Sequence, residues 1–279
     1  MDDEKIKKAV RESYAKIAKQ SGSCCGSKGP SSRNPDLIKD ASKKMGYSRE
    51  ELEAAPEGSN LGLGCGNPVA ISSLKEGDTV LDLGSGAGFD CFLAASKVGE
   101  NGKVIGVDMT AEMIDRAREN ARKDNYKNVE FRLGEIENLP VADNSVDVII
   151  SNCVINLAPD KRKVFKEAFR VLKPGGRLMV SDIVLYNQLP DIIKNSVEAY
   201  SACISGAMMK DDYLDTIKAA GFRDLKITDE RSFSINCVNI YDPKKDTIDR
   251  IDLPQKDVEN LQNAGASISI FAIKPNEIS

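Results

Sequence analysis

Cysteines carry the chemistry of this 279-residue chain, which has seven of them and no histidine. Cys65 lies in the glycine-rich stretch NLGLGCGNP, Cys153 in SNCVINL and Cys203 in YSACISGAMM. Three thiols without an imidazole form a soft, all-sulfur set, which suits a thiophilic centre and suits Mg²⁺ or Ca²⁺ poorly. We interpret Cys91 and Cys237 as small core residues, because a single buried cysteine usually has that role.

The predicted elements place these three thiols towards one pocket. The fourth parallel strand is predicted to end at Cys153, and the carboxyl edge beside the first strand is where open α/β sheets bind ligands. Cys65 precedes a predicted helix capped by Asn67, and a helix N-terminus favours thiolate, so we expect Cys65 to be unusually anionic. Cys203 falls in an insertion near 183–212 that follows the fifth predicted strand. In open α/β folds, the chain at this position commonly covers the pocket in which the substrate binds.

The segment LDLGSGAGFD at 81–90 joins a predicted strand to a predicted helix. Its glycines let the backbone turn sharply and approach a ligand. The spacing is G-x-G-x-G, and the last glycine of a dinucleotide-type G-x-G-x-x-G would fall on Phe89. A carboxylate two residues before the first glycine could organise a cationic amino acid group. The predicted cofactor-binding residues of this turn are Asp82, Gly84, Ser85, Gly86 and Gly88.

The next strand ends add further cofactor contacts. KVIGVD ends on Asp108, where an acid can accept both ribose hydroxyls, and Met109 offers an apolar face for adenine. GEIENLP at 134–140 closes the third strand, with Glu135 available to an adenine amino group. Since single acids often only end strands or cap helices, the prediction depends on these elements occurring together and in order. Two further residues, Ile136 and Asn152, complete the predicted cofactor-binding set.

From Thr79 onwards, strands alternate with helices, which predicts an α/β fold with a mostly parallel sheet and helices on both faces. An amphipathic helix over 4–19 and short helices near 36–45 and 49–55 precede it. The predicted strands are 79–84, 103–108, 129–134, 146–153 and 176–182, followed by an antiparallel pair from 225–235 and 266–275.

The predicted domain organisation has two parts. Residues 1–66 form a helical and loop extension that carries Cys24, Cys25 and Cys65. Residues 67–279 form the α/β domain, which includes the insertion near 183–212.

The composition of the chain argues against several classes of protein. The formal charge of −4 leaves no broad basic surface, so nucleic acid and anionic membranes are poor partners. No apolar run approaches the roughly 20 residues of a membrane span, and the charged N-terminus lacks the apolar segment of a signal peptide. We therefore expect a cytoplasmic protein. An odd number of scattered cysteines argues against a disulfide framework or a zinc ribbon.

Four motifs together resemble the class I S-adenosylmethionine methyltransferases. They are D-L-G-S-G-A-G at 82–88, G-V-D-M at 106–109, G-E-I-E-N-L-P at 134–140 and L-K-P-G-G-R-L at 172–178. The resemblance covers roughly residues 70–275. It implies a Rossmann-like, seven-stranded sheet whose last strand is antiparallel, with S-adenosylmethionine over the carboxyl ends of the first two strands.

A narrower resemblance joins N-L-G-L-G-C-G-N-P at 60–68, S-N-C-V-I-N-L at 151–157 and the cysteine at 203. This combination is similar to the arsenite S-adenosylmethionine methyltransferases, which produce methylated arsenicals in arsenic detoxification. The resemblance implies that Cys65, Cys153 and Cys203 hold trivalent arsenic, with arsenite or methylarsenite as substrate. Arsenic attacks the methyl carbon through a lone pair that carries no proton, so the transfer needs no general base.

The same resemblance implies a redox thiol near the N-terminus and a thiol reductant of the glutathione or thioredoxin type as co-substrate. Either Cys24 or Cys25 could be that thiol, and we take Cys25 as the working choice. Both lie in a Gly/Ser-rich stretch that predicts a flexible loop, from which a thiol could form a transient disulfide with a ligand cysteine.

Two other functions share part of this pattern. A methyltransferase for a small organic acceptor, such as a quinone or sterol carbon, would use the same cofactor motifs and make the cysteines incidental. Such chemistry often needs a positioned base, and this chain has no histidine, although Tyr, Asp or Glu could serve. A non-catalytic thiol protein that binds metalloids would suit the Cys24-Cys25 pair but would leave the cofactor motifs unexplained.

Overall fold

The computed structural model describes residues 2–20, 35–67, 74–233, 239–242, 247–250, 261 and 263–276. Cys24, Cys25, Cys237 and nearly all of the helix expected after Asn67 lie outside these ranges.

A seven-stranded sheet organises the molecule, in the order β3-β2-β1-β4-β5-β9-β6. The strands β3, β2, β1, β4 and β5 are mutually parallel, and β9 is antiparallel to both of its neighbours, β5 and β6. This arrangement confirms the Rossmann-like class I methyltransferase topology. The strands are β1 (Thr79–Leu83), β2 (Lys103–Asp108), β3 (Val129–Leu133), β4 (Val146–Asn152), β5 (Leu172–Leu185), β6 (Arg223–Phe233) and β9 (Gly265–Ile273).

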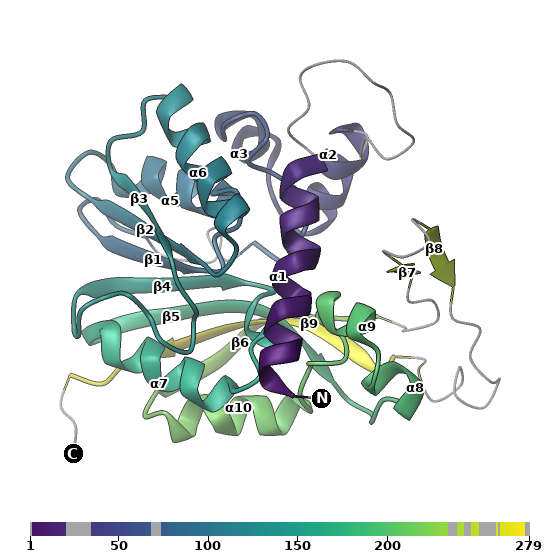
Figure 1. Cartoon of the computed structure of the whole chain (residues 1–279). Helices are drawn as coiled ribbons and strands as arrows, with labels where there is room; N and C mark the ends of the chain where they lie inside the picture. Colours follow the sequence, from purple (N-terminus) through teal and green to yellow (C-terminus); the bar gives the residue numbers. More distant parts are fainter. Residues whose placement is uncertain are drawn as a thin grey trace.

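Helices cover both faces of the sheet (Figure 1). On one face α5 (Phe89–Val98) and α6 (Ala111–Lys123) pack against side chains such as Val80. On the other, α7 (Lys161–Val171) and α10 (Lys210–Ala219) pack against Leu81 and its neighbours. Successive side chains of a strand point to opposite faces, and both faces are covered, so these strands are apolar along their length rather than alternating.

The N-terminal helices lie against this layered core. They are α1 (Asp3–Gln20), α2 (Pro35–Lys44) and α3 (Arg49–Ala54), close to the predicted ranges. The predicted capping box of α3 is present, because the Ser48 hydroxyl accepts from the Glu51 N–H at 3.1 Å and the Glu51 carboxylate accepts from the Ser48 N–H at 2.9 Å. Helix α1 contacts α6 and α9 (Val197–Ser201), so the extension packs directly on the α/β domain, and a boundary at 66/67 stays a prediction.

Two elements differ from the predictions. Strand β5 is longer than expected at both ends, because Leu172 pairs with Val146 of β4 and β9 pairs with β5 as far as Leu185. A separate hairpin of β7 (Asn239–Asp242) and β8 (Thr247–Arg250) was not predicted. The insertion after β5 forms α8 (Asp191–Lys194) and α9, and a 3₁₀ turn, η1 (Ile155–Leu157), follows β4. Of the helices in the described ranges, none combines the length and apolar character that a membrane span requires.

Candidate active site

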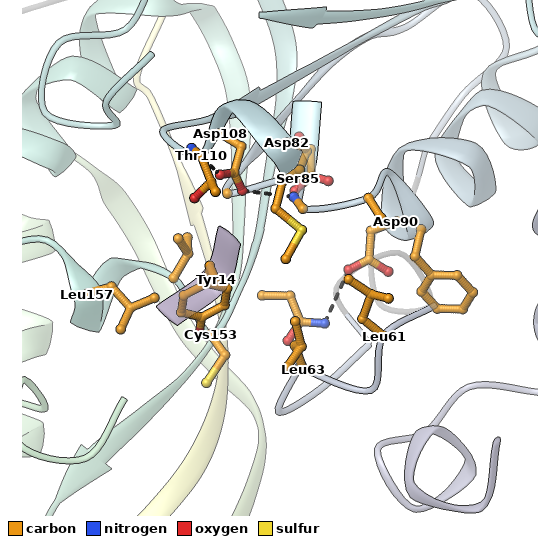
Figure 2. A pocket seen from close by; sticks show the side chains of 18 of the residues that line it. Tyr14, Leu61, Leu63, Asp82, Ser85, Asp90, Asp108, Thr110, Cys153 and Leu157 are labelled. Atoms are coloured by element: carbon orange, nitrogen blue, oxygen red, sulfur yellow. Dashed lines mark hydrogen bonds between the residues drawn. The ribbon is translucent and has the colours of Figure 1, made fainter. Parts of the chain in front are cut away.

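A cavity opens at the carboxyl ends of β1, β2 and β4, with about 1080 Å³ of empty space, open solvent included. Helix α1 contributes Lys7, Val10 and Tyr14 to its lining. In the view of Figure 2, Ser85 and Asp108 lie above the cavity, and Tyr14 lies below them beside Cys153. This is the edge of the sheet at which the sequence predicted both cofactor and acceptor.

The glycine-rich turn forms one wall of the cavity. Gly84, Gly86 and Gly88 all have positive φ angles, of 70°, 52° and 93°, which favour glycine. A Cβ at Gly84 would collide with Val154, whereas a Cβ at Gly86 would meet nothing within 4 Å. The buried Ser85 hydroxyl has no hydrogen-bond partner among the described residues. An open backbone beside an unpaired hydroxyl fits a polar cofactor lying along this turn.

Asp108 ends β2 and lines the cavity, as expected. Its carboxylate accepts from the Gly86 N–H at 3.0 Å and from the Thr110 N–H at 2.8 Å. Burial raises the pKa of Asp108 despite these hydrogen bonds. The two amides fix the carboxylate in place, and its remaining lone pairs are available to a ligand such as a ribose.

Asp82 and Asp90 form a buried acid pair at the same wall. Burial, and then the neighbouring Asp90 carboxyl, raise the pKa of Asp82 well above its usual range. Burial also raises the pKa of Asp90 to about 6, although the Tyr47 hydroxyl donates to it at 2.7 Å. A cationic ligand group would relieve the repulsion between the two carboxylates, which suits the amino group that the sequence assigned to Asp82.

Asn152 connects the two halves of the site. Its carbonyl oxygen accepts from the Cys65 N–H at 2.8 Å, and its amide donates to the Gly66 carbonyl at 2.7 Å and to Tyr47 at 2.8 Å. Asn152 lines the cavity, but the protein already occupies its amide. Its observed contacts therefore hold the Cys65 loop.

The adenine end differs in part from the sequence prediction. Met109 and Ile136 line the cavity, as expected. Glu135, predicted for the adenine amino group, is not part of the lining and instead forms an ion pair with Lys7 at 2.6 Å. Glu137, which lines the cavity, is 3.2 Å from the same ammonium group. Lys7 of α1 thus binds the Glu135 carboxylate at the edge of the cavity, and the contact of Glu135 with adenine stays a prediction.

The structure brings Cys65, Cys153 and Cys203 together, although 138 positions separate the first from the last. The Cys153 thiol has hydrogen-bond contacts with both other thiols. The Cys65 thiol also donates to the Ser181 carbonyl at 3.4 Å, and the Cys203 thiol to the Cys153 carbonyl at 2.9 Å. Cys153 lines the cavity, whereas Cys65 and Cys203 are not part of its lining. In contrast, Cys91 belongs to the buried face of α5 and donates to Asp82 at 3.2 Å.

The expectation of an anionic Cys65 is wrong for the ligand-free chain. The hydrogen bond with Cys153 lowers the pKa of Cys65, but burial and the Asp182 carboxyl outweigh it, and the net pKa is raised. The pKa of Cys153 is raised well above its usual range, mainly by its hydrogen bonds with Cys203 and Cys65. Burial among other acidic groups thus favours neutral thiols.

Two of the thiols occupy an unusual backbone conformation. Cys153 has a φ of 58° and Cys203 a φ of 62°, in the left-handed region that residues with a side chain seldom adopt. The Cys65 loop is held differently, by close packing. A Cβ at Gly64 would approach the Asn152 amide to 2.5 Å, and one at Gly66 would approach Ser181 to 2.7 Å. The left-handed backbone at Cys153 and Cys203 is strained, and such strain persists only where the surrounding structure enforces it.

Two residues at this site were missed from the sequence. Asp182 is completely buried beside Cys65 and Cys153, and it ends the predicted strand 176–182, a position where an acid is worth noting. Tyr14, which lies in the helix predicted over 4–19, donates to the Ser201 carbonyl at 3.4 Å. Burial, followed by the nearby Cys203 and Cys153 thiols, raises the pKa of Tyr14 well above its usual range.

Comparisons with known proteins agree with this geometry. A family model described as "Methyltransferase domain" matches residues 74–221. The chain is 46% identical over 251 residues to an arsenite methyltransferase of Halobacterium salinarum, covering 88% of this chain and 64% of that one. It is 41% identical over 204 residues to an arsenite methyltransferase of Aquipseudomonas alcaligenes, covering 70% and 58% respectively. The chain thus spans less than two thirds of the length of these relatives.

A solved structure is similar over a larger share of its own length. The crystal structure of an arsenic(III) S-adenosylmethionine methyltransferase from Chlamydomonas reinhardtii matches with a TM-score of 0.60 and 32% identity. The match covers 87% of this chain and 74% of that one.

Proposed function

Because the chain belongs to the arsenite S-adenosylmethionine methyltransferases, we propose that it methylates trivalent arsenic held by Cys65, Cys153 and Cys203. The observation that carries this proposal is the convergence of the three buried thiols beside the cofactor cavity. An incidental set of core cysteines has no reason to meet at the carboxyl edge of the sheet, where ligands bind.

Binding of arsenite at this site needs no base. Each thiol that replaces an arsenic-bound hydroxyl gives its proton to that hydroxyl, and water leaves. Neutral thiols are therefore suitable reactants, which agrees with the raised pKa of Cys65 and Cys153. The three sulfurs leave the arsenic lone pair as the free fourth position.

On the donor side, the residues that would hold S-adenosylmethionine are those of the glycine-rich turn, with Asp108 for the ribose and Asp82 for the amino group. When bound, the cofactor supplies a methyl group on a positively charged sulfonium. The arsenic lone pair forms the new As–C bond while the C–S electron pair leaves with sulfur, so arsenic passes from trivalent to pentavalent. The chain contributes orientation, which alone can lower a barrier by several kcal/mol.

Return to trivalent arsenic requires two electrons, which we assign to thiols. Cys24 or Cys25 would form a disulfide with a ligand cysteine, and a thiol reductant of the glutathione or thioredoxin type would then reduce that disulfide. Replacing both Cys24 and Cys25 by Ser should leave arsenite binding intact and impair steady turnover. Methylation of an already monomethylated trivalent species should suffer much less. A double variant that turns over arsenite at the wild-type rate would contradict this role.

The decisive experiment adds methyl-labelled S-adenosylmethionine, arsenite and a thiol to the protein and measures labelled organic arsenic. Arsenite-dependent label separates this function from the two alternatives. A protein that labels a quinone or sterol but not arsenic has an organic acceptor instead. A protein that binds arsenite but transfers no label is a thiol-binding protein without this activity. We further propose a cytoplasmic role in arsenic detoxification, since free thiols of this kind persist in reducing compartments.

A further inference from the structure

Asp182 adds an oxygen ligand to the thiol cluster that arsenic does not need. One of its carboxylate oxygens and the sulfur atoms of Cys65 and Cys153 all lie within 4.8 Å of one another. Trivalent arsenic is satisfied by three sulfurs and keeps a lone pair. A carboxylate at this position, completely buried, has no role in that coordination.

Protein contacts orient the Asp182 carboxylate firmly. Oδ1 accepts from the Asn156 amide at 2.8 Å and from the Ile183 N–H at 2.9 Å, whereas Oδ2 accepts, among the described residues, only from the Tyr213 hydroxyl at 3.1 Å. Oδ1 has thus used both lone pairs, and Oδ2 keeps one. Carboxylates that ligate metals are held by outer hydrogen bonds in this way.

The distances suit a tetrahedral ion after a small contraction. Zinc–sulfur bonds of about 2.3 Å place ligand atoms about 3.8 Å apart in a tetrahedron. The observed upper limit of 4.8 Å exceeds this by about 1 Å. Cys203 is the fourth candidate ligand: it interacts with Cys153 but lies outside the group within 4.8 Å, so its thiol would have to move towards the other ligand atoms. The buried ammonium group of Lys161 interacts electrostatically with Asp182 and Cys203, and so offsets part of the negative charge that four ionised ligands would bring.

We propose that Cys65, Cys153, Cys203 and Asp182 form a four-ligand site for a thiophilic divalent cation of the Zn²⁺ or Cd²⁺ class, which competes with arsenite. Such a closed-shell cation has no lone pair to attack a methyl group, so it makes a dead-end complex at the acceptor site. Only this inhibition rests on the proposed function, since binding of the cation does not require methyl transfer.

The test uses the full-length, reduced protein and Cd²⁺ as the probe, followed by ultraviolet thiolate-to-metal absorption. Asp182→Asn should weaken Cd²⁺ binding by about 10-fold or more, since loss of an outer hydrogen bond to a metal ligand already has an effect of about that size, and it should change arsenite affinity by no more than a few-fold. Cys203→Ser should weaken the binding of both ligands. Cys91→Ser is the matched control, because this buried thiol lies outside the cluster and should change neither affinity. Arsenite should displace bound Cd²⁺ competitively.

Several outcomes would overturn the site. These are Cd²⁺ binding that Asp182→Asn leaves unchanged, simultaneous binding of Cd²⁺ and arsenite, or an equal loss of both ligands in Asp182→Asn. Tyr213→Phe provides a second variant, since it removes the hydroxyl on Oδ2 but keeps the carboxylate, and it should weaken Cd²⁺ binding less than Asp182→Asn does. If Cd²⁺ binds as expected but labelled arsenic never forms, the methyltransferase proposal fails and the cation site stands.

Discussion

The two halves of the active site are built by different means. The cofactor wall comes mainly from one short segment, the turn between β1 and α5, with Asp108 from the adjacent strand end. The acceptor cluster takes one cysteine from the loop before β1, one from the end of β4 and one from the turn after α9. The donor half therefore depends on local backbone conformation, whereas the acceptor half depends on long-range packing.

Because the two halves are built differently, substitutions should affect each of them by a different mechanism. In the turn, glycines create the site by leaving space, and Gly86 has nothing within 4 Å of a virtual Cβ. In the cluster, side chains create the site, and Cys153 and Cys203 hold left-handed backbone conformations without being glycine. Substitutions should accordingly act through backbone strain in the first half and through lost sulfur atoms in the second.

Removal of the central thiol should have the largest effect. Cys153→Ser is expected to lower arsenite-dependent methyl transfer by more than about 1000-fold, because it removes the thiol that lines the cofactor cavity and interacts with both other thiols. S-adenosylmethionine affinity should stay within a few-fold. Labelled transfer and calorimetric titration measure the two effects. A variant that keeps its activity, or loses both properties together, would show that the halves are not separable.

In the glycine-rich turn, a substitution should lower the stability most where other side chains crowd the backbone. Gly84→Ala combines a φ of 70° with a collision against Val154, and we expect a loss of about 3 kcal/mol in the free energy of unfolding. Gly86→Ala is the matched control, since its left-handed φ is equally unfavourable but its surroundings are open, and it should cost about 1 kcal/mol. Urea denaturation of both ligand-free variants checks the difference, and equal losses would show that packing does not decide it.

The buried acids of both halves should give the stability a pH dependence. Burial raises the pKa of Asp182 to about 7. Between its ordinary pKa and this value, the folded chain keeps a proton that the unfolded chain releases, so stability falls as the pH rises through this range. The free energy of unfolding of Asp182→Asn should therefore rise by a few kcal/mol relative to that of the wild type as the pH increases from about 4 to about 8. Asp90→Asn should show a smaller gain in the free energy of unfolding, complete near about pH 7, because burial raises the pKa of Asp90 only to about 6. Denaturation at several pH values tests both, and a pH-independent difference would contradict them.

Asp108 tests the donor half by itself. Asp108→Ala should weaken S-adenosylmethionine binding by roughly 30-fold, since a hydrogen bond to a charged group contributes about 2 kcal/mol and the Gly86 amide also loses its acceptor. The arsenite affinity should not change. Met109→Leu keeps an apolar face and should alter cofactor affinity by less than a few-fold. Calorimetry decides the matter, and an unchanged affinity in Asp108→Ala would remove the ribose assignment.

The smallest expected effect concerns strain at the thiols. Cys203→Gly should be more stable than Cys203→Ala by about 1 kcal/mol, because glycine relieves the φ of 62°. The same pair of variants at Cys65, which does not have a positive φ, should favour alanine or show no difference. Thermal unfolding of the four variants provides the comparison. A result in which both positions behave alike would place the cost of the cluster elsewhere.

Most of the fold followed from local sequence patterns. Apolar runs such as TVLDL and VDVIISN predicted buried strands within a residue or so of their ends, and the capping pattern at Ser48 predicted the start of α3. The hairpin of β7 and β8 was missed, since four-residue strands carry little periodic signal. The added length at the C-terminal end of β5 was missed because residues 183–185 pair with residues of β9 that lie 80 to 84 positions away in the sequence.

The sequence by itself determined the donor half, because a glycine-rich turn and the strand end beside it are local features whose conformations follow from residue type. It also singled out three cysteines as acceptor ligands. Only the tertiary structure decided which groups surround them. Packing placed Asp182 against two thiols, turned Glu135 towards Lys7 and raised the pKa of Cys65 where a local helix argument predicted the opposite. Burial and the charges of distant residues set these properties, and neither is encoded in the residues adjacent along the chain.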